Sequence, residues 1–311
     1  MNTFKANHVF IANKLKKEVK TIKISPIFYM GNKKKLINKG LIDLFPKDIN
    51  IFIDIFSGSG VVSMNTIANK YMINDIDENL FRLYLLFKNN SSEDIINHVE
   101  QRIEEYSLPK ERTRRIEFKD DEKIEKYKLA YTTFRSYYNK TKNVLDFYTL
   151  MFFSFSQQFR FNSTGGFNMP YGTDCFSETN KEYIKNGCEF FNQDNVKVFN
   201  KDFKTLKIDK LNQNDFIYLD PPYLNTTATY NENGGWNIDD EDALYDLCER
   251  LSVQGIKWGM SNVFKNKGIK SQKLIEWCDK NNFNVFTFDK VLYSACGKGN
   301  SNAQEVYICN Y

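Results

Sequence analysis

Histidine is scarce in this chain of 311 residues, and its cysteines form no pattern typical of a metal site. The two histidines and six cysteines show no CxxC pair and no zinc-ligand spacing, so we expect no bound metal. No apolar run approaches the roughly 18 residues of a membrane span, and the first residues lack the basic, apolar and small-residue order of a secretory signal. We therefore expect a cytoplasmic protein without a membrane partner.

The sequence also lacks an internal repeat and a compact cluster of two acids and a lysine, so neither a repeat fold nor nuclease activity is expected. Hydrophobic residues make up 41% of the chain, which at this length is enough for a sizeable core. We therefore expect a folded globular protein.

The net charge of +4 is unevenly distributed along the chain. Residues 1–40 hold ten lysines and one acid, a balance of +9 that leaves −5 for the rest of the chain. A basic arm fits a polyanionic partner such as nucleic acid, because phosphate neutralisation releases counterions. The same lysines also fit the solvated face of an amphipathic helix, which we predict over residues 7–20.

Strand and helix signals alternate in the first third of the chain. An apolar run over residues 50–56 closes on a glycine turn, a helix signal follows over 61–70, and a short strand over 71–74 ends in Asp75. A further helix is predicted over 78–88. This order is typical of a βαβ unit in a parallel sheet.

The alternation stops over residues 89–188, which combine helical and loop-like stretches dense in charge and aromatics. It resumes over 189–311, with predicted strands at 196–200, 216–220, 256–260, 284–288 and 305–309 and helices at 239–251 and 271–280. We therefore predict a single α/β sheet built from residues 1–88 and 189–311, interrupted by an insertion.

The most informative motif is Asp220-Pro221-Pro222-Tyr223, directly after the apolar strand FIYLD. Ligands of open α/β sheets bind at the carboxyl ends of strands. The two prolines stiffen the loop and leave carbonyls free to accept, the carboxylate accepts a second hydrogen bond, and the tyrosine offers a stacking face. This set fits an aromatic amine nucleophile, although a rigid turn is the simpler alternative.

A second motif, Asp54-Ile55-Phe56-Ser57-Gly58-Ser59-Gly60, follows the first strand. Glycines let the backbone turn tightly beside a ligand, and Asp54 could accept from the ammonium of an amino acid. One βαβ step later, Asp75 stands where an acid holds ribose hydroxyls. Together they indicate a cofactor that carries adenosine, without naming it; a nucleotide loop or a structural turn remains the alternative for the glycines.

The ordered set FYMGNK (28–33), DIFSGSG, NDID, RFNSTGGFNMPYG (160–172) and DPPY resembles the Dam-type family of adenine-specific DNA methyltransferases in its α-class order. The resemblance covers about residues 25–311. It implies a Rossmann-like methyltransferase sheet that uses S-adenosylmethionine, with residues 89–188 as a helical target-recognition domain. It also implies an adenine flipped out of double-stranded DNA as substrate.

Carried over residue by residue, the resemblance implies that Tyr29, Gly31 and Lys33 border the cofactor. Asp54, Phe56 and Gly58 would form the methionine side of its pocket, Asp75 would hold the ribose, and Asp202-Phe203 would contact the adenine. The catalytic loop would be Asp220, Pro221, Pro222 and Tyr223.

The DNA contacts are expected in two loops. Arg160 and Asn162 offer base or phosphate contacts, with Gly165-Gly166 permitting close approach to a groove; a structural turn is the alternative. Lys298 and Asn300 could reach DNA near the flipped base, and a flexible hairpin tip is the alternative there. A basic stretch over residues 101–142 could add phosphate contacts. No arginine follows Asn162 in this loop, so the resemblance does not predict GATC as the recognition sequence.

Two other functions fit the same residues. One is methylation of a different nucleobase amine, such as cytosine in DNA or a base in RNA. The other is a non-catalytic DNA-binding relative, which the intact DPPY and glycine motifs disfavour. A cognate restriction endonuclease, acting separately, is a further possible partner.

Overall fold

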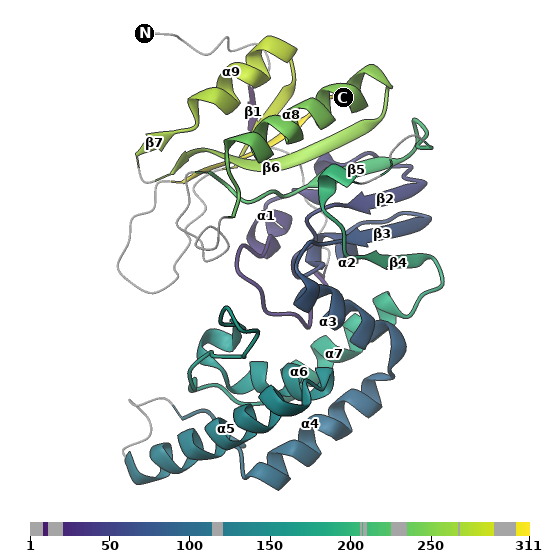
Figure 1. Cartoon of the computed structure of the whole chain (residues 1–311). Coiled ribbons are helices and arrows are strands. Elements are labelled where there is room, and N and C mark those ends of the chain that lie inside the picture. Colours follow the sequence, from purple (N-terminus) through teal and green to yellow (C-terminus); the bar gives the residue numbers. More distant parts are fainter. Residues whose placement is uncertain are drawn as a thin grey trace.

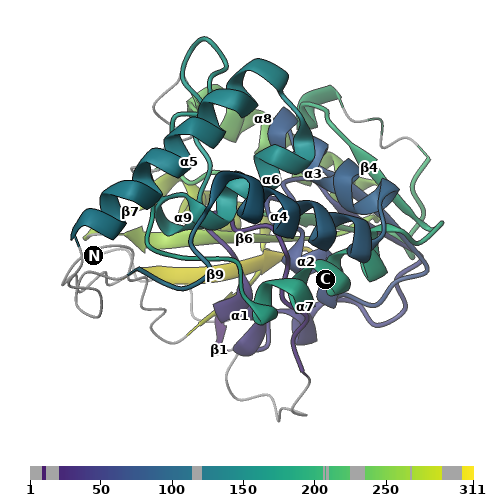
Figure 2. The ribbon, with the colours of Figure 1, turned by 90° about the horizontal axis from the view of Figure 1, so that it is seen from below.

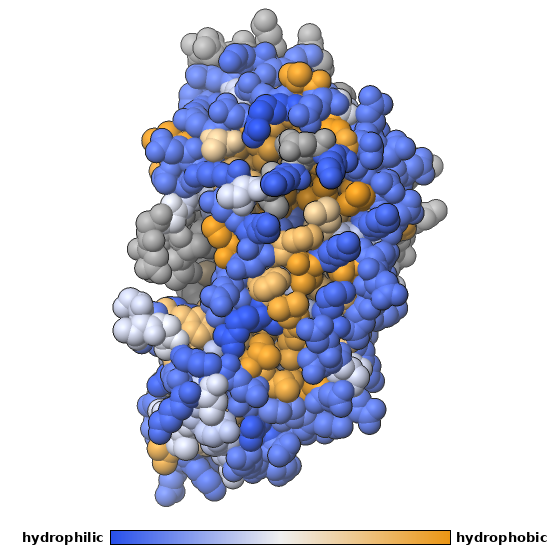
Figure 3. Space-filling view, turned by 45° about the vertical axis from the view of Figure 1, so that its right-hand side comes forward, coloured by the Kyte–Doolittle hydropathy of each residue, from blue (hydrophilic) through white to orange (hydrophobic). Residues whose placement is uncertain are grey.

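The computed structural model describes residues 21–113, 121–205, 207, 210–224, 235–266, 268–288 and 303–311, and the backbone alone of 9–11 (Figure 1). No helix in these ranges is long and apolar enough to cross a membrane. On the face shown in Figure 3, hydrophobic residues gather in a band down the middle of a mostly hydrophilic surface.

The described strands form one mixed sheet in the order β1-β8-β9-β6-β5-β2-β3-β4, with β7 paired to β6. The pairs from β6 to β4 are all parallel, and β9 runs antiparallel to both of its neighbours, β6 and β8. The strands are β1 (Val9–Ile11), β2 (Ile51–Asp54), β3 (Lys70–Asn74), β4 (Val196–Phe199), β5 (Phe216–Leu219), β6 (Lys257–Asn266), β7 (Ile269–Lys270), β8 (Asn284–Thr287) and β9 (Gln304–Cys309). The predicted α/β fold is confirmed.

The first βαβ unit forms as predicted, with one difference. Helix α2 (Val61–Asn65) ends five residues earlier than expected, because Lys70 already pairs with Ile51 as the first residue of β3. Helix α3 (Glu78–Asn89) begins at Asp77, whose carboxylate accepts a hydrogen bond from the Asn79 amide. Short helices α1 (Lys34–Asn38) and η3 (Ile42–Leu44) lie before β2.

Each face of the sheet has its own hydrophobic cluster. On one face, α8 (Ile238–Val253) and α9 (Gln272–Asn281) bury Leu244, Leu251 and Leu274 among residues of β5, β6, β8 and β9. The strand β5 is buried along its whole length, as expected for a strand of a parallel sheet that is covered on both faces.

The other face continues into a helical layer (Figure 2). This layer contains α4 (Ser92–Tyr106), α5 (Asp121–Thr141), α6 (Val144–Phe153), η4 (Phe155–Gln157) and α7 (Glu178–Phe191). One cluster of buried residues joins Phe52 of the sheet and Leu83 of α3 to Phe147 and Ile184 of this layer. The predicted boundary after residue 188 falls inside α7, and the division into domains stays a prediction.

The predicted N-terminal helix is wrong for the part that the structure describes. Val9–Ile11 form β1, which pairs parallel with β8 through Val285 and its neighbours. The local pattern fitted a helix, but β-branched and aromatic residues also favour strands, and the partner strand lies far along the chain. The lysines of this arm between residues 12 and 20 lie outside the described residues.

Candidate active site

A cavity of about 490 Å³ opens at the carboxyl ends of β2, β3 and β5. The chain proceeds from β2 to β3 and β4 on one side, and from β5 to β6 on the other, so β2 and β5 flank a topological switch point, where ligands bind in such sheets. The cavity is lined by all the residues predicted to catalyse or to bind a cofactor: Tyr29, Gly31, Lys33, Asp54, Phe56, Gly58, Asp75, Asp202, Phe203, Asp220, Pro221, Pro222 and Tyr223.

The turn between β2 and α2 lines the cavity at Gly58, which has no side chain. Gly58 and Gly60 have φ values of 50° and 73°, in the left-handed region that favours glycine. A Cβ atom on Gly58 would lie 3.1 Å from the ring of Tyr29. The Tyr84 hydroxyl of α3 donates to the Gly58 carbonyl oxygen at 2.6 Å and holds the turn in place.

Asp54 ends β2 as a buried carboxylate with one oxygen unused. Its Oδ2 accepts from the Ser63 hydroxyl at 2.6 Å, whereas Oδ1 has no hydrogen-bond partner among the described residues. Burial raises the pKa of Asp54 to about 7, and the negative charges of Asp220 and Asp75 add to that rise, while the Ser63 hydrogen bond opposes it. A cationic donor in the cavity would satisfy Oδ1 and favour the ionised form.

Asp75 joins the end of β3 to the glycine turn. Its Oδ2 accepts from the Gly58 amide at 2.8 Å and its Oδ1 accepts from the Asp77 amide at 3.0 Å. Burial raises its pKa to about 6, and these two hydrogen bonds partly offset the rise. Each oxygen keeps a second lone pair for a ligand hydroxyl. Although several acids surround the cavity, no group of three His, Cys, Asp or Glu in the described ranges is arranged to hold a metal.

Asp220 follows β5 and is tied to a lysine from the N-terminal segment. The Lys33 ammonium lies 2.7 Å from Asp220 Oδ2 and also donates to the Gly31 carbonyl at 3.1 Å. Among the described residues, Oδ1 accepts a single long hydrogen bond, 3.3 Å, from the Tyr223 hydroxyl. Burial raises the pKa of Asp220, and the charge of Lys33 lowers it. Lys33 was predicted to border the cofactor; it does line the cavity, but its ammonium is paired with the DPPY carboxylate.

Three aromatic rings pack together in the lining of the cavity and form an aromatic wall. Phe56, Phe203 and Trp236 have ring centroids 5.4 to 5.6 Å apart. The Trp236 indole N–H donates to Glu241 Oε2 at 3.2 Å, which fixes the ring against the start of α8. Trp236 was not predicted, because only the folded sheet brings it beside the other two rings. The available signal was a tryptophan shortly before the helix predicted over 239–251, which forms as α8 with Asn237 as its N-cap.

The family comparison agrees with this geometry. Residues 29–290 match the family described as D12 class N6 adenine-specific DNA methyltransferase. The chain belongs to this D12 class. It is 36% identical over 293 residues to the type II methyltransferase M.FokI of Planomicrobium okeanokoites, and 35% identical over 294 residues to the modification methylase StsI of Streptococcus sanguinis. Each match covers 92% of this chain and 43% of the relative, so the D12-class chain spans less than half of the length of these two relatives.

A more distant relative is matched over most of its own length. The DNA adenine methylase of Vibrio cholerae is 26% identical over 226 residues, which is 68% of this chain and 71% of the relative. The relatives that this chain matches therefore differ in length, and M.FokI and StsI are much longer than this chain.

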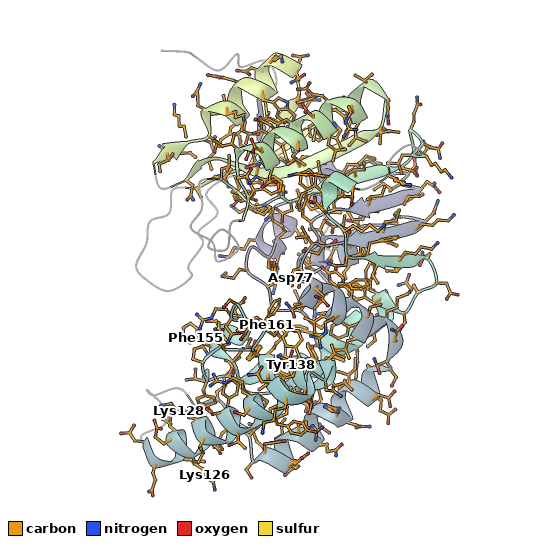
Figure 4. The ribbon with its side chains drawn as sticks, in the orientation of Figure 1. Asp77, Lys126, Lys128, Tyr138, Phe155 and Phe161 are labelled. Carbon is orange, nitrogen blue, oxygen red and sulfur yellow. The ribbon has the colours of Figure 1, made fainter. Side chains whose placement is uncertain are left out.

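Two of the residues predicted to contact DNA, Arg160 and Asn162, are described and are not among the residues that line the cavity. They are on the loop between η4 and α7. Phe155 of η4 and Phe161 of this loop lie on the side of the helical layer nearer to Asp77, opposite Lys126 and Lys128 (Figure 4). Lys298 and Asn300 fall outside the described residues.

Arg160 and Asn162, the two residues predicted to contact DNA, both form side-chain hydrogen bonds within the loop. Arg160 donates to Asn168 Oδ1 at 2.9 Å, and Asn162 Oδ1 accepts from the Gly166 amide at 2.7 Å and from Thr164. Asn162 thus closes the turn, which was the structural alternative, and its contact with DNA stays a prediction. Both residues are exposed.

One face of α5 holds this loop in place. The Asn139 side chain forms two hydrogen bonds with the Phe167 backbone: Nδ2 donates to the carbonyl oxygen at 3.0 Å, and Oδ1 accepts from the amide at 2.7 Å. Tyr131 and Arg135 both donate to the Met169 carbonyl, and Lys142, just after α5, donates to the Gly165 carbonyl at 2.6 Å. The loop is therefore a preformed structure, with its backbone anchored from one side.

Proposed function

We propose that this chain transfers a methyl group from S-adenosylmethionine to the N6 amine of an adenine flipped out of duplex DNA. The observation that carries the proposal is the shared cavity. Asp220, Asp54 with its buried Oδ1 that has no partner among the described residues, and an aromatic wall all line the same 490 Å³ cavity. An amine nucleophile and a cofactor with an amino-acid end and a heteroaromatic end would need these groups together.

The residues of the cavity fit S-adenosylmethionine. Asp54 Oδ1 offers an acceptor for the amino group, Asp75 has lone pairs for ribose hydroxyls, and Phe203 with Trp236 offers apolar rings for adenine. When bound, the cofactor supplies a methyl group on a sulfonium sulfur. The assignment of each residue follows its chemistry and its position around the cavity.

The DPPY loop fits an amine that must be made nucleophilic. The lone pair of an exocyclic adenine amine is delocalised into the ring, so acceptors that favour a tetrahedral nitrogen concentrate that pair for attack. Asp220 Oδ1, with only one long hydrogen bond from Tyr223, can accept from the amine. Lys33 holds the other oxygen and favours the ionised carboxylate. The Tyr223 ring supplies a face for the base.

The proposal is tested by a transfer assay with modified-base sequencing. DNA from a host that expresses the wild-type chain should contain N6-methyladenine at one recognition sequence, and DNA from a host with Asp220→Asn should not. Calorimetry in metal-free buffer should show S-adenosylmethionine binding to both proteins. Methylcytosine in place of methyladenine, or no binding of the cofactor, would refute the proposal.

We also propose that the chain works beside a restriction endonuclease that acts separately. The support is that the relative from Streptococcus sanguinis is named a modification methylase. DNA methylated by the chain should then resist cleavage by one restriction endonuclease of the same recognition sequence. Unchanged cleavage would argue for a methyltransferase without such a partner.

A further inference from the structure

A second, smaller pocket of about 240 Å³ lies beside the DPPY loop and has no role in the proposed transfer. Its lining includes Tyr223 and Leu224 on one side, and the end of β6, β7 and the start of α9 on the other. Because β5 and β6 are parallel neighbours, this pocket faces the same edge of the sheet as the main cavity. Tyr223 is a wall of both pockets.

The β6–β7 hairpin brings two lysines together without an acid between them. Lys265 and Lys270 are direct partners across this antiparallel pair. Side chains of direct partners lie on the same face, where like charges destabilise the pairing. Within the described part of the chain, neither lysine forms an ion pair. An anion bound at the hairpin would relieve this repulsion.

The start of α9 adds backbone donors to the same pocket. This helix has ten residues and no side-chain cap, and the hydroxyl of its N-cap residue Ser271 donates to the Val263 carbonyl at 2.8 Å. The amides of Gln272 and Lys273 donate to no described residue. A helix N-terminus carries partial positive charge, and its free amides point toward an anion.

The side chain of Asn262 is a further, independent indication that this pocket binds a ligand. Asn262 is 6% exposed and lines the pocket. Its Oδ1 accepts from the Val263 amide at 2.7 Å, whereas its Nδ2 donates to no described residue. An acceptor bound in the pocket would give this donor a partner.

The acids near the pocket are already engaged. Glu241 also lines it, but its two carboxylate oxygens accept from Trp236 and from the Tyr245 hydroxyl. Asp242 forms an ion pair with Lys273. Lys270 and the donors of Asn262, Gln272 and Lys273 remain, and together they suit a ligand that only accepts hydrogen bonds and carries negative charge.

We propose that this pocket binds a phosphodiester group of the DNA strand that carries the target base. The proposal rests on the proposed function, since it places the base at Tyr223. A base and its phosphate are joined through one sugar, so a nucleotide extruded into the main cavity leaves its phosphate nearby. The shared wall at Tyr223 puts the second pocket at that position. Holding this phosphate would fix the extruded nucleotide in register with Asp220.

The test compares Lys270 of β7 with Lys280 of α9. Lys270→Ala removes a charge from the pocket, and Lys280→Ala removes an exposed charge in the last turn of α9, at the end far from the pocket. Binding of the full-length chain to a duplex with its recognition sequence is measured by fluorescence anisotropy between roughly 50 and 200 mM salt. The Lys270→Ala slope of log affinity against log salt should be shallower by about 0.9, and the Lys280→Ala slope should match wild type.

A second variant tests the buried amide. Asn262→Asp keeps the size of the side chain but replaces the donor by an acceptor with negative charge, so DNA affinity should fall tenfold or more while S-adenosylmethionine binding stays normal. Equal slopes for Lys270→Ala and Lys280→Ala, or normal DNA affinity of Asn262→Asp, would overturn the anion site. Failure of the proposed function has a different signature, namely a wild-type chain that binds DNA with the expected slopes but methylates no adenine.

Discussion

The ammonium of Lys33 lies 2.7 Å from Asp220 Oδ2, and the two side chains are 6% and 17% exposed. The two residues are 187 positions apart in the sequence, and both line the cavity. Burial alone would push the Asp220 carboxyl toward its neutral form, and Lys33 opposes that push. In the proposed reaction, the lysine would act through the charge state of the carboxylate.

Lys33→Gln should move the acidic limb of the pH–rate profile to higher pH. Without the ammonium, the pKa of Asp220 rises further above its ordinary value of 3.8, so the carboxylate is protonated at a higher pH than in the wild type. The measurement is methyl transfer on DNA from pH 5 to 9. Lys34→Gln, an exposed neighbour, is the control and should leave the limb in place. An unmoved limb in Lys33→Gln would show that the pair does not govern Asp220.

Substitutions in the DPPY loop should separate chemistry from binding. Asp220→Asn keeps the volume and leaves Lys33 a polar neighbour, so we expect transfer to fall by about a hundredfold or more while cofactor binding persists. Tyr223→Ala should cost about ten- to a hundredfold, since stacking of a base on an aromatic ring contributes about 1–3 kcal/mol. Tyr223→Phe should be mild, because it keeps the ring and the bond that it removes from Asp220 is long, 3.3 Å. Near-normal transfer by Asp220→Asn would reduce the motif to a rigid turn.

Cofactor affinity should depend on pH through Asp54. Its pKa is about 7 in the free protein, and a bound ammonium at Oδ1 would lower it. Binding of S-adenosylhomocysteine should therefore be strongest above pH 7 and weaken as the pH falls through 7, by up to about tenfold per unit. Calorimetry over pH 5.5 to 8.5 measures this. Asp54→Asn should bind weakly with a flat profile, and a flat profile in wild type would contradict the assignment.

Much of the site follows from the sequence because the motifs sit at strand ends. The run before Asp220 and the run before Ser57 are apolar, short and bounded by turn residues, so β5 and β2 could be predicted, and parallel strands bring their carboxyl ends to one edge. The fold therefore places Asp54 and Asp220 around one cavity without further information.

The remaining features depend on contacts that no local pattern encodes. Trp236 joins the aromatic wall only through the fold, and Lys33 meets Asp220 across 187 positions. β1 exists because β8 offers it an edge, so a segment with helical periodicity forms a strand. Asn162 was predicted by its residue type to contact DNA, but the same type also closes turns, and in this loop its oxygen does so.

A buried cluster of charged side chains joins α4 and α6 in the helical layer. Asp146 is fully buried, and its Oδ1 accepts from Arg102 Nε at 2.8 Å and pairs with His98 Nε2 at 2.8 Å. Burial raises the pKa of Asp146, but His98 and Arg102 more than offset it, so the pKa lies below 3.8. The carboxylate is therefore ionised at neutral pH, and its contribution to stability is lost only as the pH falls below that value.

Asp146→Ala should destabilise the protein by about 3–5 kcal/mol at pH 7, because removing one partner leaves the mostly buried Arg102 charge uncompensated. Glu105→Ala is the matched control, since Glu105 pairs with the same arginine but is 46% exposed, and an exposed pair contributes at most about 1 kcal/mol. Urea unfolding at pH 7 measures both. The helical layer and the sheet share one hydrophobic cluster, so the loss should appear in a single transition that includes the sheet. Equal effects of the two substitutions would mean that the buried carboxylate contributes no more than a surface pair. A separate early transition in Asp146→Ala would mean that the helical layer unfolds as an independent domain.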